Sequence, residues 1–147
     1  MVYWSYDKRA RGKNTIKLIN CIENYVKNSN GVNFMSLSTL KLPHKERQAL
    51  QEIKQNLREK LGGRLLMVRL YGSKARGTWK PWSDTDLFIV VKNKKDEDTA
   101  FRIAYKTGEK HDVYTIEPLV YTKERWEKMR AIPTLLMQFI DKEGVDI

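Results

Sequence analysis

The stretch that decides the fold covers residues 64–92 and reads RLLMVRLYGSKARGTWKPWSDTDLFIVVK. Two apolar segments within it, residues 65–71 and 87–91, are short and rich in residues that favour strands, as expected for buried β-strands. Glycine, basic and acidic residues lie between the two segments. We therefore predict two strands whose connection carries the chemically active side chains.

Two acidic side chains stand at the start of the second predicted strand. Successive side chains of a strand point to opposite faces, so Asp84 and Asp86 should share one face while Thr85 points to the other. Two carboxylates that close repel each other unless one is protonated or a cation bridges them, and hard oxygen ligands suit Mg²⁺. The spacing predicts a divalent metal site.

The end of the first predicted strand has the composition of a phosphate-binding bend. Gly72 and Ser73 allow a sharp turn into a short helical segment, where free backbone amides and a hydroxyl can meet phosphate oxygens. Arg76 follows a few residues later and can neutralise phosphate charge. The bend is therefore a candidate anion-binding segment.

Together these features resemble the signature of the DNA polymerase β nucleotidyltransferase superfamily. The order is a strand, Gly-Ser, a basic helical turn, a ten-residue spacer and Asp-x-Asp before an apolar strand. GSKARG at 72–77 followed by SDTDL at 83–87 looks most like the minimal nucleotidyltransferases, which are also similar to the catalytic domain of aminoglycoside nucleotidyltransferases. The resemblance implies an α/β (α+β) fold of the polymerase β-like kind, a small mixed sheet flanked by helices.

The resemblance also implies roles for the residues of the motif. In this family an acceptor oxygen attacks the α-phosphorus of a nucleotide, and two metal ions about 3.5 to 4 Å apart stabilise the attacking and leaving oxygens. Asp84 and Asp86 would hold the two Mg²⁺ ions, with ATP or another nucleoside triphosphate as substrate. The residues implied to bind the nucleotide phosphates or offset their charge are Gly72, Ser73, Lys74 and Arg76.

Members of the superfamily usually carry a third carboxylate on a later strand. Residues 111–121 form the third predicted strand, in which Pro118 favours an edge position or a bulge because proline cannot donate to a ladder. Asp112 and Glu117 differ in strand parity, so only one can face the site. Glu117 is the predicted third catalytic and metal-binding acid, because its spacing to Trp126 is similar to that in relatives, and Asp112 is the less favoured choice.

Apolar residues at helical spacing predict several helices around these strands. They cover residues 14–28, residues 44–61, a short stretch within 99–110, a segment capped by Thr122, and a last helix that Pro133 opens and Gly144 ends. Residues 93–98 are expected to form a charged turn. The resemblance begins near residue 44, which divides the chain into a basic N-terminal helical extension at 1–43 and a nucleotidyltransferase domain at 44–147.

The net charge of +10 is concentrated in the first part of the chain. Residues 1–64 hold 13 lysines and arginines against 5 acids, and residues 65–147 hold 15 against 13. A basic flank attracts polyanions such as nucleic acid, acidic protein surfaces and nucleoside triphosphates, but a solvated charged face has the same composition. No apolar run approaches the ~20 residues of a membrane span, and the start lacks a secretory apolar core, so we expect a cytoplasmic protein with no membrane partner.

Three functions remain open at this level. The resemblance favours transfer of AMP from ATP to a partner protein, such as the HEPN toxin that minimal nucleotidyltransferases adenylylate, or catalysis in a groove formed by a homodimer. A non-catalytic antitoxin, acting as a binding module, is the second function, and the paired Asp84 and Asp86 weigh against it. The third is an RNA-directed nucleotidyltransferase that holds RNA through its basic N-terminal region.

Overall fold

The structure is a computed structural model that describes residues 37–147. The helix predicted over residues 14–28 and most of the basic N-terminal extension lie outside the described residues. Helices and strands then follow one another along the chain. In order they are α2 (His44–Leu61), the 3-10 turn η1 (Gly62–Arg64), β1 (Leu65–Tyr71), α3 (Gly72–Arg76), β2 (Thr85–Val91), α4 (Lys95–Lys110), β3 (Ile116–Thr122), α5 (Lys123–Arg130), α6 (Leu135–Glu143) and β4 (Val145–Asp146).

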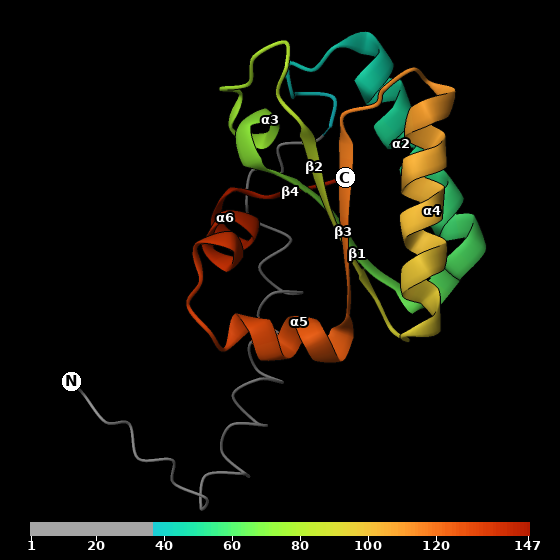
Figure 1. Cartoon of the computed structure of the whole chain (residues 1–147), viewed down its shortest axis with the longest axis vertical. Coiled ribbons are helices and arrows are strands. Elements are labelled where there is room, and N and C mark those ends of the chain that lie inside the picture. Colours follow the sequence, from blue (N-terminus) through green and yellow to red (C-terminus); the bar gives the residue numbers. More distant parts are fainter. Residues whose placement is uncertain (1–36) are drawn as a thin grey trace, which may run out of the picture. The chain divides into compact units, whose positions relative to one another are not determined.

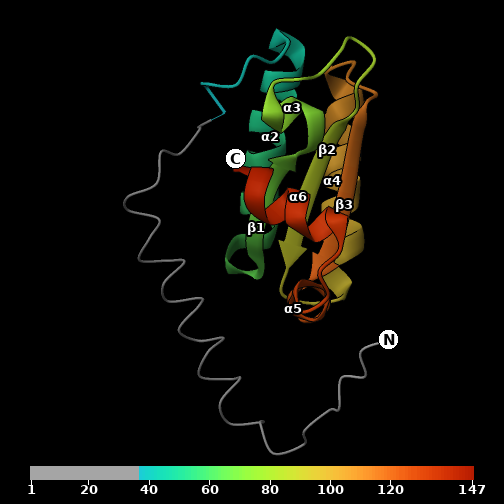
Figure 2. The same cartoon turned by 90° about the vertical axis from the view of Figure 1, so that its left-hand side faces the viewer.

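The four strands form one mixed sheet in the order β3-β2-β1-β4. β2 pairs in parallel with β3, whereas β1 is antiparallel to both of its neighbours. Helices α2 and α4 cover one face of the sheet, and α5 and α6 lie on the other (Figures 1 and 2). The predicted fold class is therefore confirmed, and Pro118 lies on an edge strand as its missing N–H requires.

Strand β2 is buried on both faces, which explains its unbroken apolar run. Every second side chain of β2 points toward α2 and α4 and belongs to the larger hydrophobic cluster; these residues are Leu87, Ile89 and Val91. The intervening side chains, Phe88 and Val90, pack with Trp126 and Ile140 under α5 and α6. Asp86 precedes Phe88 by two residues and therefore opens toward the α5 and α6 face.

Helix α2 has the bounds that its apolar spacing predicts. Its buried residues recur every three or four positions and are Ala49, Leu50, Ile53, Leu57 and Leu61. Leu40 and Leu42 are buried in the same cluster, at 3% and 8% exposure. The boundary at 43/44 stays a prediction, and this packing favours a domain that starts before His44.

Two predicted boundaries in the second half are wrong. Residues 95–98 form the first turn of α4 and not a charged turn, because Asp96, Glu97 and Asp98 suit the positive end of a helix dipole. The third strand starts at Ile116 and not at residue 111, because α4 runs to Lys110 and a turn follows it. Asp112 lies in that turn with a φ of 56°.

The structure also contains a short strand that the sequence did not predict. β4 follows α6 directly and pairs with β1 through Arg69 and Leu70. Within residues 37–147, no helix combines the length and the apolarity that crossing a membrane demands.

Candidate functional site

The bend after β1 and the start of β2 meet at one end of the sheet. Gly72 has a φ of 75°, in the left-handed region that favours glycine. A Cβ atom at this position would overlap Oδ2 of Asp86. Glycine is therefore required twice, by the backbone conformation and by the close approach of the aspartate.

Strand pairing brings Glu117 next to Asp86. The two residues are register partners across the parallel β2–β3 pair, and Tyr71 is the partner of Asp86 on the other side, across β1 and β2. Side chains at partner positions share a face of the sheet. Tyr71, Asp86 and Glu117 thus form one row across three strands, on the face that carries α5 and α6.

Negative charge is crowded at this end of the sheet. Burial, and after it the charges of Asp84 and Glu117, raises the pKa of Asp86 above its ordinary value. Among residues 37–147, no lysine, arginine or histidine forms an ion pair with any of these three carboxylates. Asp84 and Glu117 therefore repel the charge of Asp86, and the described residues supply no ion-pair partner to any of the three.

The hydroxyl of Tyr71 belongs to the same environment. Burial, followed by the charge of Asp86, raises the pKa of Tyr71 to about 12. Tyr71 consequently keeps its proton at neutral pH and offers a hydrogen-bond donor beside the carboxylates. The sequence pointed to this residue only through its place directly before Gly72.

The donor set fits a magnesium ion that nucleotide and water help to coordinate. No group of three or more histidine, cysteine or acidic side chains converges on one metal position within the described part of the chain. Mg²⁺ is, however, usually held by one or two carboxylates together with water and substrate phosphates. Asp84 is exposed and Asp86 is partly buried, so both carboxylates retain access to solvent and to a ligand.

Helix α6 holds the short helix of the bend in place. The guanidinium of Arg76 in α3 pairs with Glu143 at 2.7 Å and lies 5.7 Å from the centre of the Phe139 ring. The Arg76 side chain remains 39% exposed. Its predicted role at the phosphates stays a prediction, as does that of Ser73, which is partly buried at the start of α3.

Lys74 is buried and paired, whereas the other predicted phosphate-binding residues are at least partly exposed. Its side chain is 2% exposed, and its ammonium is 2.6 Å from Oε2 of Glu46 and 2.9 Å from Oγ1 of Thr85. Thr85 points away from Asp86, toward α2, because neighbouring strand residues face opposite ways. The role of Lys74 at the phosphates stays a prediction, and the burial and pairing of its ammonium weigh against that role.

Asp112 lies in the exposed turn after α4 and pairs with Lys45 at 2.9 Å. It is not on β3, so it has no register partner on β2. Glu117 is consequently the acid that the sheet brings to Asp86.

The two tryptophans of the connection separate into two environments. The indole of Trp79 donates a hydrogen bond to the carbonyl of Lys41 at 2.8 Å, so this ring ties the loop to the residues before α2. Trp82 is 75% exposed. Only Trp82 therefore remains available to a ligand in solution.

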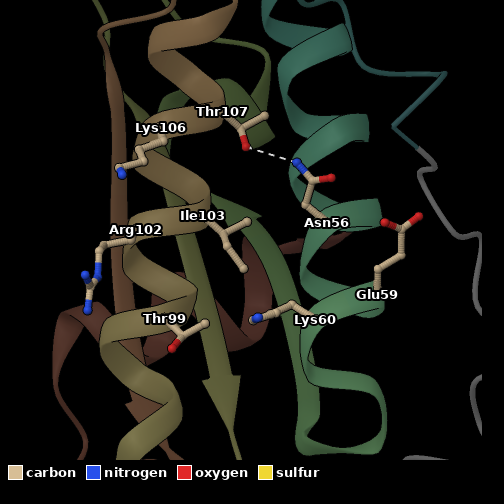
Figure 3. A pocket seen from close by; sticks show the side chains of 8 residues that line it. All are labelled: Asn56, Glu59, Lys60, Thr99, Arg102, Ile103, Lys106 and Thr107. Atoms are coloured by element: carbon tan, nitrogen blue, oxygen red, sulfur yellow. Dashed lines mark hydrogen bonds between the residues drawn. The ribbon is translucent and has the colours of Figure 1, made fainter.

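A groove of about 580 Å³ lies elsewhere, between α2 and α4 (Figure 3). Asn56 and Thr107 join across it through a hydrogen bond of 3.3 Å. These helices cover the face of the sheet opposite to Asp86, so the groove is separate from the carboxylate site.

Comparisons with known proteins agree on the kind of domain. A family model described as a nucleotidyltransferase domain matches residues 50–134. A protein of Methanocaldococcus jannaschii named as an inferred protein adenylyltransferase is 29% identical over 103 residues, which is 68% of this chain and 96% of that protein. A second such protein of the same organism is 43% identical over 44 residues, 30% of each chain.

Two solved structures are similar at a lower level. A toxin-antitoxin structure with AMP-PNP is 18% identical, with a TM-score of 0.46 over 71% of this chain and 72% of that one. An inferred nucleotidyltransferase from Sulfolobus solfataricus is 19% identical, with a TM-score of 0.35 over 72% of this chain and 87% of that one.

Proposed function

Because the chain belongs to the nucleotidyltransferase domain family, we propose that it transfers AMP from ATP to an acceptor oxygen on a partner protein. The observation that carries this proposal is the meeting of Asp84, Asp86 and Glu117, without ion-pair partners among the described residues, beside the left-handed Gly72. Unpaired carboxylates at the mouth of a glycine bend suit a metal-bound triphosphate.

We assign the residue roles from the resemblance together with the geometry of the bend. Asp84 and Asp86 would hold two Mg²⁺ ions, which would supply charge stabilisation at the attacking and leaving oxygens. The amides at Gly72 and Ser73 orient the β- and γ-phosphates, and Arg76 offsets charge on the departing pyrophosphate. Glu117, beside Asp86, helps to hold one ion and to accept the proton of the attacking hydroxyl.

The nature of the acceptor rests on the relatives. This chain matches 96% of the length of one relative, which is named as an inferred protein adenylyltransferase. That name favours a protein hydroxyl over a small molecule as the acceptor. The resemblance to minimal nucleotidyltransferases suggests a toxin of the HEPN kind as the partner, with a tyrosine as the acceptor. Such a hydroxyl attacks the α-phosphorus, pyrophosphate leaves, and the products are an adenylylated protein and pyrophosphate.

The test is a label-transfer assay with Mg²⁺ and ATP labelled at the α-phosphate. The full chain is incubated with the protein encoded by the neighbouring gene, and in parallel with RNA. We expect label on the protein, no transfer from ATP labelled at the γ-phosphate, and no transfer in excess chelator. Label on RNA would instead indicate an RNA-directed enzyme, and label on neither, with the partner still bound, would indicate a non-catalytic antitoxin.

Matched aspartate substitutions test the assignment of the site. Asp84→Asn and Asp86→Asn should each lower transfer by about 10²-fold or more, the scale of losing one electrostatic group that acts on the transition state. Asp112→Asn is the control, because it makes the same chemical change at a residue that lies in a turn and pairs with Lys45. An Asp112 variant as inactive as the other two would contradict the placement of the site.

A further inference from the structure

Lys74 is a buried cation in the middle of the motif. Its side chain is 2% exposed, although lysine is rarely buried and an ammonium is costly to remove from water unless it is paired. Glu46, itself 13% exposed, supplies the counter-charge from α2. The sequence around Lys74 does not account for this burial.

The ammonium of Lys74 joins three elements of the fold. Lys74 belongs to α3, and its Nζ donates to Oε2 of Glu46 on α2 at 2.6 Å and to Oγ1 of Thr85 on β2 at 2.9 Å. The Thr85 hydroxyl also lies 3.4 Å from Oε2 of Glu46. The three side chains form a closed hydrogen-bonded cluster in which every pair is in contact.

The cluster lies directly behind the two halves of the site. Lys74 follows Ser73 in the chain, and Thr85 stands between Asp84 and Asp86. The Thr85 side chain is fully buried on the face of the sheet opposite to Asp86. The cluster thus contacts the bend and the aspartate-bearing strand on the face of the sheet opposite to Asp86.

Two other roles fit these contacts less well. The ammonium has three N–H groups, of which Glu46 and Thr85 accept two, but the side chain is 2% exposed, so a phosphate could reach the third only after the surrounding elements moved apart. A purely stabilising role needs no ion pair, because apolar residues of similar volume often stabilise a buried position as well or better. Directional hydrogen bonds from one ammonium to two elements instead define how α3 is set against β2.

We propose that Lys74 is a positioning residue that holds the Gly72–Ser73 bend against the aspartate-bearing end of β2 and against α2. The anchoring follows from the contacts alone, whereas its consequence for nucleotide binding rests on the proposed function. An anchored bend presents its amides to phosphates without first losing conformational freedom, so that nucleotide binds more tightly.

The experiment compares two variants with one control in the full chain. Lys74→Met combined with Glu46→Gln removes the ammonium without leaving a buried charge unpaired. Thr85→Val keeps the ion pair and the shape of the side chain but removes the bond to β2. The control is Lys45→Met, which removes an exposed lysine that is adjacent to Glu46 and pairs with Asp112.

Two readouts separate anchoring from general stability. The first is amide hydrogen exchange across residues 72–78 relative to α4, and the second is the Kd for ATP in the presence of Mg²⁺. In the double variant we expect exchange to rise about tenfold at residues 72–78 only, and the Kd to rise about tenfold, as for loss of a charged hydrogen bond. Thr85→Val should show the same pattern at smaller amplitude, and Lys45→Met should match the wild type.

Wild-type exchange at residues 72–78 in Thr85→Val, or a rise in exchange shared equally with α4, would overturn the proposal. A Lys45→Met chain with the same selective change would overturn it as well. A wild-type chain that binds no ATP contradicts the proposed function, while the exchange measurements still decide the anchor. If the double variant does not fold, Thr85→Val decides both readouts.

Discussion

Asp86 is the residue at which burial and like charge act together. Its pKa is raised first by burial and then by Asp84 and Glu117, whereas the smaller effects of the Lys74 and Arg76 charges lower it. Ionisation of a carboxyl group in this position lowers the free energy of unfolding. The loss disappears when the group is neutral or when a cation lies beside it.

The stability of the protein should therefore respond to Asp86 in a defined direction. Because the folded-state pKa is raised above the unfolded value, the folded state binds more protons between the two values, and the free energy of unfolding falls as pH rises through that window. In metal-free buffer at neutral pH, we expect Asp86→Asn to raise the Tm, and the gain to shrink as pH falls below the raised pKa. Thermal unfolding over a pH series measures this.

Magnesium provides the complementary half of that measurement. Added Mg²⁺ should raise the Tm of the wild type more than that of Asp86→Asn, because a ligand stabilises only the form that binds it. An Asp86→Asn chain that melts below the wild type at neutral pH in chelator would contradict the electrostatic account.

Gly72 offers a second residue-scale prediction. An alanine there adopts a left-handed conformation and overlaps Asp86, so Gly72→Ala should cost about 1 to 3 kcal/mol in the free energy of unfolding and abolish transfer. Gly63→Ala is the matched control, since a Cβ at Gly63 meets nothing within 4 Å. Denaturant unfolding measures the free energy of unfolding of both variants. Equal values for the two would show that the bend tolerates a side chain at residue 72.

At the scale of elements, the C-terminal part of the chain is tied to β1 by one arginine. Arg69 is 5% exposed and donates from Nε to Asp146 of β4 at 2.7 Å and from Nη1 to the carbonyl of Ile140 in α6 at 3.0 Å. α6 in turn holds α3 through Arg76 and Glu143. The last strand and helix therefore support the bend from the side.

Removing the β4 end of this link should loosen the C-terminal elements. Asp146→Ala leaves the buried guanidinium of Arg69 with fewer acceptors, and we expect a loss of about 1 to 3 kcal/mol in the free energy of unfolding, the range for hydrogen bonds to charged groups. Asp98→Ala, which breaks an exposed pair with Arg102 and removes one of three acids from the first turn of α4, should cost only about 0.5 kcal/mol. An equal effect of the two substitutions in urea unfolding would argue against the link.

At the scale of the whole molecule, the start of the domain is decided by packing. Leu40 and Leu42 are buried in the cluster that α2, β1 and β2 share, and Arg47 donates to the carbonyl of Leu40 at 2.9 Å. If the domain includes residues 40–43, Leu40→Ala should cost about 2 to 5 kcal/mol in the free energy of unfolding. A loss below about 0.5 kcal/mol, as at exposed positions, would place the boundary at residue 44. Leu66→Ala, at 45% exposure, is the control.

Elements with one strong local pattern were predictable. Helix α2, which has regular apolar spacing, and strand β1, which is a short apolar run, both have the bounds that the sequence predicts. β4 was missed because two residues carry no periodicity, and it forms only where Arg69 and Leu70 offer a strand to pair with. β3 starts later than predicted because a turn over residues 111–115 separates it from α4.

The candidate site divides in the same way. Alternation along a strand and the conformational freedom of glycine are local properties, so the sequence by itself indicated that the chain bends at Gly72 and that Asp84 and Asp86 can share a face. The register that sets Glu117 beside Asp86 depends on the pairing of β2 with β3. Burial and charge pairing depend on residues far along the chain. Only the tertiary structure decided that Lys74 is buried against Glu46, because an ammonium leaves water only where folding supplies its partner.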